Sequence, residues 1–289
     1  MRRACIDIGS NTTRLLVADC AGRELVELRQ ERAFTLIGPS IGHLGAIPAA
    51  KLAEVLEAVV RQHALARELG AERIRCVATA AVRRASNGEV LARLIAGGCD
   101  GLELEILDGT EEARLAFIGA AWSVGATTEM GLGVVDAGGG SSELVVGQAP
   151  DKVEWSVSLP LGSGVITHAH LGSDPPTDAE LGAAREGIRE ALAGVRPPDS
   201  VQRLVAVGGS ATSVRLLAGP IVDPDAVAYL LRKFRGLTAA ELAGRYGVEL
   251  QRARLLTAGL LILGGISELF DRPLEIGRGG LREGLLLTG

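Results

Sequence analysis

Residues 5–17, CIDIGSNTTRLLV, align without a gap on residues 134–146, VVDAGGGSSELVV, at a constant offset of 129 positions. The matched positions keep their residue class: Asp7 with Asp136, Gly9 with Gly138, Thr12 with Ser141, Thr13 with Ser142 and Leu15 with Leu144. An ordinary turn has no reason to repeat its acid, glycine and hydroxyl positions so far along the chain. The repeat therefore predicts two related lobes that face one cleft.

Each copy consists of an apolar run, a polar turn and a second apolar run, which is the pattern of a β-hairpin. Glycines let the backbone approach a ligand, and successive amides in such turns can point at one anion, for which phosphate is the natural choice. Asp7 and Asp136 would repel a phosphate directly, so we expect them to hold a divalent cation. Either segment alone fits an ordinary turn equally well. The duplication favours a site for phosphate and magnesium.

The bulk composition limits the classes of partner. With 289 residues, 47% hydrophobic and 22% charged, the chain is long enough for two compact lobes. A formal net charge of -5 and 3% aromatic residues disfavour a nucleic-acid polymer as partner. The four cysteines form no CxxC pair, and the N-terminus lacks the long apolar run of a secretion signal. The apolar residues 255–263 are too few to span a membrane, so we expect a cytoplasmic protein.

Alternating strand and helix patterns place the chain in the α/β class. In the first half we expect strands at 23–33, 74–78 and 102–107 and helices at 49–69, 89–96 and from residue 111 onward. In the second half we expect strands at 153–159, 204–207 and 274–276 and helices at 178–194, 238–246, 252–269 and 279–286. Residues 204–212, LVAVGGSAT, predict a third phosphate-competent turn, where a buried strand enters a helix. Ser, Gly and Thr collect at 122–130, which predicts lobes of residues 1–125 and 126–289.

Seven short motifs resemble those of one enzyme family and occur in its order along nearly the whole chain. They are DIGSNT at 7–12, TAAVRRASN at 79–87, GTEEAR at 109–114, DAGGGSSE at 136–143, LPLGSG at 159–164, GGSAT at 208–212 and GGLREG at 279–284. The chain resembles the exopolyphosphatase/guanosine pentaphosphate phosphatase (Ppx/GppA) family, in a short form lacking the C-terminal HD-type domains. The resemblance implies an actin-like fold of two ribonuclease H-like lobes, as in sugar kinases and Hsp70, with a catalytic cleft between them. The C-terminal helix is expected to pack back onto the first lobe.

The resemblance also assigns roles to individual residues. Its catalytic carboxylate falls on Glu111 or Glu112, of which we favour Glu112, and Arg83 would contact the phosphate chain, with Asn87 completing its motif. The expected phosphate-binding residues are Ser10, Asn11, Thr12, Gly138, Gly139, Gly140, Ser141, Gly209 and Ser210. The expected ligands for Mg²⁺ or Mn²⁺ are Asp7, Asp136 and Glu143. Arg278 and Arg282 flank the last glycines and either line the cleft or pair with acids of the other lobe.

The expected activity is release of terminal orthophosphate from inorganic polyphosphate, with a preference for short chains, by water attack assisted by a glutamate. Alternatives are a guanosine pentaphosphate (pppGpp) 5'-phosphohydrolase, a kinase or ATPase of the same superfold, and a non-hydrolytic nucleotide sensor. Glu112 speaks against a sensor, because binding alone does not require an acid that positions water. A homodimer is a further expectation from the family.

Overall fold

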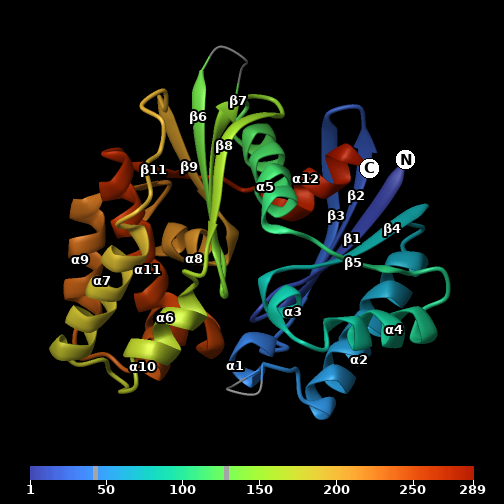
Figure 1. Ribbon diagram of the computed structural model, residues 1–289, viewed down its shortest axis with the longest axis horizontal. Coiled ribbons are helices and arrows are strands. Elements are labelled where there is room, and N and C mark those ends of the chain that lie inside the picture. The colour runs from blue at the N-terminus through green and yellow to red at the C-terminus, as the bar shows by residue number, and fades with distance from the viewer. Residues whose placement is uncertain (42–44, 127–129) are drawn as a thin grey trace.

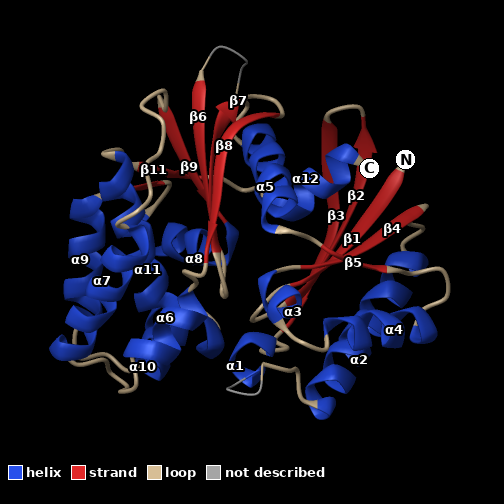
Figure 2. Cartoon of the chain, in the orientation of Figure 1, coloured by secondary structure: helices blue, strands red, loops and turns tan. Residues whose placement is uncertain are grey.

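The computed structural model describes residues 1–41, 45–126 and 130–289, and it consists of two lobes, each built on one β-sheet (Figure 1). The first sheet contains β1 (Arg2–Ile8), β2 (Thr13–Ala21), β3 (Glu24–Ala33), β4 (Arg73–Ala78) and β5 (Leu104–Ile106). Its helices are α1 (Ile37–Ile41), α2 (Ala49–Glu68), α3 (Ala80–Arg84) and α4 (Gly88–Gly98). Figure 2 shows these helices gathered on one side of the first sheet.

The second lobe is built on a similar sheet and contains more helices than the first. Its strands are β6 (Gly131–Ala137), β7 (Ser142–Gln148), β8 (Lys152–Leu159), β9 (Arg203–Val207), β10 (Ile221–Val222) and β11 (Leu274–Ile276). Its helices are α6 (Ser163–His170), α7 (Asp178–Leu192), α8 (Gly208–Ala218), α9 (Pro224–Phe234), α10 (Ala239–Tyr246) and α11 (Leu250–Phe270). Two more helices, α5 (Gly109–Ser123) and α12 (Leu281–Thr288), lie between the two sheets (Figure 1).

The strand order is the same in both sheets. It is β3-β2-β1-β4-β5 in the first and, read from the opposite end, β8-β7-β6-β9-β11 in the second, which β10 then extends. In each sheet the first three strands are antiparallel and the next two are added in parallel. The actin-like α/β fold of two ribonuclease H-like lobes is therefore confirmed.

Both predicted hairpins are confirmed in position. Asp7 pairs with Arg14 across the first hairpin, and Asp136 pairs with Glu143 at the equivalent place in the second. Since the repeat aligns these residues at the offset of 129, the two sheets present their turns in the same way.

The core of each lobe is aliphatic, as the composition requires. In the second lobe α11 is enclosed by α6, α7, α8, α9 and α10. By length and composition α11 meets the test for a membrane span, but 67% of its most apolar 18-residue window is buried inside the protein. This helix is therefore accounted for as the central helix of a folded lobe.

Each of the two helices between the sheets packs on the sheet of the other half of the chain. The face of α5 that carries Phe117 packs on the second sheet against β6, β7 and β9, whereas α12 packs on the first sheet through Leu285 and its neighbours. The two helices touch at Gly119 and Gly284, where a Cβ on Gly119 would collide with the carbonyl of Gly280. The division at residue 125 stays a prediction, and residues 127–129 of the predicted linker lie outside the described residues. The helix before the division completes the second lobe.

Candidate active site between the lobes

The two hairpin turns present free amide groups to one cleft. Each turn is closed by a hydrogen bond, from Gly9 N–H to Thr12 O at 2.9 Å and from Gly138 N–H to Ser141 O at 3.0 Å. Within the described parts of the chain, the N–H groups of residues 10–12 and 139–141 donate no hydrogen bond. Three successive unbonded amides form a concavity that favours an anion. Each lobe therefore offers one such anion site.

Neighbouring segments fix the orientation of these amides. The carbonyls of Ser10 and Asn11 accept hydrogen bonds from Gly38 N–H (2.8 Å) and Leu36 N–H (3.1 Å). In the second lobe the carbonyls of residues 138 and 139 accept from the first N–H groups of α6, at residues 163 and 164. Because carbonyl and N–H point opposite ways in a trans peptide, the amides that follow are directed away from these supports. These supports hold the N–H groups of residues 11, 12, 139 and 140 ready for a ligand.

The two turns also contact each other. A Cβ on Gly139 would collide with the side chain of Asn11, and one on Gly140 would collide with Ser10. The side chains of Ser10 and Asn11 thus lie against the opposite turn, and only glycine permits this approach. All nine predicted phosphate-binding residues line the cleft: Ser10, Asn11, Thr12, Gly138, Gly139, Gly140, Ser141, Gly209 and Ser210. The last two lie in the first turn of α8, whose N-terminus adds favourable amide dipoles.

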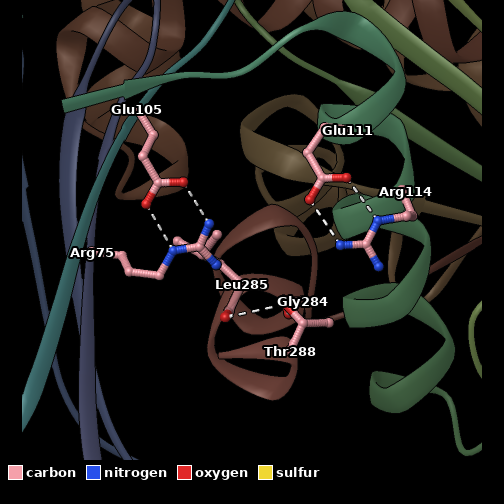
Figure 3. A network of polar contacts seen from close by, with 7 residues as sticks. All are labelled: Arg75, Glu105, Glu111, Arg114, Gly284, Leu285 and Thr288. Carbon is pink, nitrogen blue, oxygen red and sulfur yellow. Dashed lines mark hydrogen bonds and ion pairs between the residues drawn. The ribbon is translucent and has the colours of Figure 1, made fainter.

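The two candidate acids of α5 have different surroundings. Glu112 is 6% exposed, lines the cleft, and accepts a hydrogen bond of 2.8 Å at Oε2 from Arg83 Nη1. Glu111 lies outside the cleft and is bound by Arg114 through two hydrogen bonds of 2.7 and 2.8 Å (Figure 3). Burial raises the pKa of Glu112 to about 7, against the opposing effect of Arg83. A carboxyl with a pKa near neutrality is suited to accept a proton from water.

Arg83 itself does not line the cleft and is anchored from both sides. Its Nη1 also donates to the carbonyl of Leu107 at 2.6 Å, so the guanidinium joins α3 to the start of α5. Asn87 is also outside the cleft, and its side chain bonds the backbone N–H and carbonyl of Ile47 at 2.8 and 2.9 Å. Asn87 thus fixes the loop before α2, and its side chain makes no capping bond to α4.

The three predicted metal ligands all line the cleft but do not form one cluster. Burial raises the pKa of Asp7, and burial followed by the charge of Asp7 raises the pKa of Asp136 to about 6. The pKa of Glu143 is raised well above its ordinary value, first by burial and then by Glu112 and Asp136, although Ser158 donates to it at 2.8 Å. Across residues 1–41, 45–126 and 130–289, no three Asp, Glu, His or Cys side chains lie close enough to enclose one metal ion.

A smaller ligand set fits a cation better. The Oδ1 atom of Asp7 is buried without a hydrogen-bond partner among the described residues, and such an atom is costly unless something binds it. Oδ1 of Asp136 lies where a Cβ of Gly208 would be, so this carboxylate is held against the start of α8. Mg²⁺ usually takes one or two carboxylates and completes its shell with water and phosphate. Asp7 and Asp136 therefore fit such an ion, and Glu143 as a third ligand stays a prediction.

The cleft also contains several charged residues that were not predicted from the sequence. Arg14, Arg252 and Glu283 line it, as do Arg278 and Arg282, whose place had been left open. Arg14 donates to Thr12 Oγ1 at 2.9 Å, and burial followed by the charge of Arg282 lowers its pKa to about 10. The repeat held a signal for Arg14, because the offset of 129 aligns it with Glu143.

Comparison with known proteins agrees with this geometry. The model of the Ppx/GppA phosphatase family matches residues 16–288. Exopolyphosphatase 2 of Mycobacterium tuberculosis is 32% identical over 255 residues, covering 84% of this chain and 79% of the relative. Exopolyphosphatase 1 of the same organism is 31% identical over 312 residues, covering 99% and 88%.

The solved structures give the same result. The crystal structure of the Aquifex aeolicus Ppx/GppA family member superposes with a TM-score of 0.84 at 29% identity, covering 100% of this chain and 97% of that one. A second structure of the Aquifex enzyme gives 0.82 at 30% identity, covering 100% and 99%. With its duplicated hairpins, its buried acid on α5 and these relatives, the chain belongs to the Ppx/GppA phosphatase family.

Proposed function

We propose that this protein is a phosphoanhydride hydrolase that releases terminal orthophosphate from inorganic polyphosphate. The observation that carries the proposal is the pair of unbonded amide sets, at residues 10–12 and 139–141, that face one cleft beside the buried Glu112. Hydrolysis of a phosphate chain needs groups that position the phosphates and a group that orients the attacking water, and these features are suited to both roles. The family and the named relatives support the same activity.

In the proposed reaction Glu112 orients a water molecule and accepts one of its protons as the oxygen attacks the terminal phosphorus. The bond from that phosphorus to the bridging oxygen breaks, and the shortened chain leaves with the bridging oxygen. The pKa of about 7 lets Glu112 be ionised at neutral pH and still hold a proton once it has accepted one. Arg83, at 2.8 Å from Glu112, keeps the carboxylate in place and adds positive charge near the reacting phosphoryl group.

The amides of the two turns would bind the oxygens of the terminal phosphates, and Arg14 and Arg282 would neutralise charge further along the chain. A Mg²⁺ or Mn²⁺ ion, held by Asp7 and Asp136, would balance the charge of the phosphates it contacts. The charge of Glu112 contributes, after burial, to the raised pKa of Glu143, and the role of Glu143 as a third metal ligand stays a prediction.

A second candidate substrate is guanosine pentaphosphate. It is favoured by Phe34, an aromatic side chain in the lining of a cleft that is otherwise mostly polar and glycine-rich. An aromatic ring offers a stacking surface for a nucleobase, which polyphosphate does not need.

A homodimer and a cytoplasmic location stay predictions. Light scattering of the purified protein tests the first, and cell fractionation tests the second.

The experiment is phosphate release, measured with malachite green, from short polyphosphate, pppGpp and ATP in the presence of Mg²⁺. We expect release from polyphosphate and its loss in Glu112→Gln. Faster release from pppGpp would make the nucleotide the principal substrate. No release from any of the three, with wild type and Glu112→Gln alike, would overturn the hydrolase.

A further inference from the structure

One carbonyl of the second turn is supported differently from its counterpart in the first. At the offset of 129, Asn11 corresponds to Gly140. The carbonyl of Asn11 accepts from Leu36 N–H, which belongs to its own lobe. The carbonyl of Gly140 accepts instead from Arg84 Nη1 at 3.2 Å, a side chain at the end of α3 in the first lobe.

This contact fixes a peptide that carries one of the unbonded amides. The carbonyl of Gly140 and the N–H of Ser141 belong to the same trans peptide, so holding one directs the other. The N–H of Ser141 is one of the three that face the cleft in the second lobe. The orientation of this amide therefore depends on a residue across the cleft.

We propose that Arg84 is a positioning residue that couples closure of the two lobes to the orientation of the Ser141 amide. With the lobes apart, Gly140 loses its donor and the last peptide of the second turn is free to rotate. With the lobes together, the anion site of the second lobe is complete. The first lobe has no such dependence, because Leu36 and Gly38 support its turn from within.

Two observations favour positioning over direct binding of substrate. Arg84 does not belong to the cleft lining, although its Nη2 lies 3.2 Å from where a Cβ of Gly140 would be. Its neighbour Arg83 reaches from the same short helix to Glu112, on the helix that packs against the second sheet. The end of α3 thus contacts both the proposed base and the phosphate turn of the opposite lobe.

The kinetic test rests on the proposed function and compares Arg84→Ala with Arg84→Lys. A hydrogen bond from a charged donor is typically strong enough to account for roughly a tenfold effect on binding. We expect the KM for short polyphosphate to rise about tenfold in Arg84→Ala with a smaller change in kcat, and Arg84→Lys to recover most of the loss. Arg93→Ala, an exposed arginine on α4 in the same lobe, is the matched control and should behave as wild type. An unchanged KM in Arg84→Ala would overturn the coupling.

The structural test needs no activity. The native cysteines are all buried, so spin labels can be placed on Glu89→Cys in α4 and Glu190→Cys in α7, both exposed positions. In the absence of any phosphate compound, we expect Arg84→Ala to lengthen or broaden the distance between the labels, and Arg93→Ala to leave it unchanged. A residue that only contacts substrate would leave the ligand-free distance as it is, and that result would refute the inference even if the enzyme is active. A changed distance in a protein without phosphatase activity would sustain the coupling and reject the proposed function.

Discussion

Replacing Glu112 by Gln should remove most of the activity and at the same time stabilise the fold. The substitution keeps the size and the buried position of the side chain, and it removes the group that ionises. In the wild type the carboxyl pKa is raised from 4.5 to about 7, because burial penalises the charge more than Arg83 at 2.8 Å compensates it. The side chain is 8% exposed, so little solvent screening reduces this cost.

The size of the stability effect follows from the two pKa values. Between pH 4.5 and about 7 the unfolded chain has released a proton at this site while the folded chain still holds it. The wild type therefore loses stability as pH rises through this window, and at about 1.4 kcal/mol per pKa unit the loss reaches roughly 3 kcal/mol above pH 7. Glu112→Gln lacks this loss. Its melting temperature should exceed that of wild type by roughly 5 °C at pH 8 and should match it near pH 4.5.

The assays are thermal unfolding at several pH values and phosphate release from short polyphosphate. Loss of a general base costs on the order of 10² to 10⁴ in rate. Glu111→Gln is the matched control, since Glu111 is paired with Arg114 outside the cleft and should be needed for neither effect. Equal activity in Glu112→Gln and Glu111→Gln, together with a melting difference that does not vary with pH, would refute the assignment of the buried acid.

Three further predictions concern the counter-charge, the cation and the helix crossing. Arg83→Met removes the group that lowers the pKa of Glu112, so the acidic limb of the pH profile of kcat/KM should move to higher pH; an unmoved limb would contradict the pairing. Asp136→Asn should raise the Mg²⁺ concentration for half-maximal phosphate release by at least about tenfold, and an unchanged Mg²⁺ titration would exclude this carboxylate as a ligand. Gly119→Ala places a Cβ against the carbonyl of Gly280 and should destabilise the protein by about 2 kcal/mol or more. Gly182→Ala, in open space on α7, should stabilise it by about 0.5–1 kcal/mol, so denaturant unfolding of the two variants should shift in opposite directions.

Much of the fold follows from local patterns in the sequence. The predicted helix at 49–69 is observed at 49–68, and the strand at 23–33 at 24–33, because their apolar periodicity and bounding turns are written within the segments themselves. The hairpins could be predicted for a second reason, since each copy of the repeat supports the other. Seven of the nine phosphate-binding candidates belong to the repeat, and the other two, Gly209 and Ser210, were predicted from the strand that enters a glycine turn; all nine line one cleft.

Features that depend on contacts between distant segments could not be predicted in this way. No helix was predicted at 163–170, yet α6 begins at Ser163, where its first N–H groups bond carbonyls of the second turn. Residues 224–234, which form α9, carried no expectation. Arg14 interrupts an apolar run, and this position alone does not indicate that its side chain lines a cleft. The packing of α5 on the second sheet depends on its contact with α12, which lies some 160 positions later in the chain. Among the described residues no three acids lie close enough to enclose one metal ion, and the motifs that carry Asp7, Asp136 and Glu143 do not reveal this spacing.

The crossing helices show why one acid of this cleft is suited to chemistry and its counterpart is not. Glu112 is the fourth residue of α5 and Glu283 the third of α12, and both carboxylates are 6% exposed and line the cleft. Glu283 accepts the N–H of Gly280 at 2.7 Å and is thereby engaged at the start of its own helix. Among the described residues the carboxylate of Glu112 accepts a hydrogen bond only from Arg83, and Glu112 lines the cleft. The two crossing helices thus each place a buried acid of the first turn in the cleft, and the difference in their partners is why we propose Glu112, and not Glu283, as the acceptor of a proton from water.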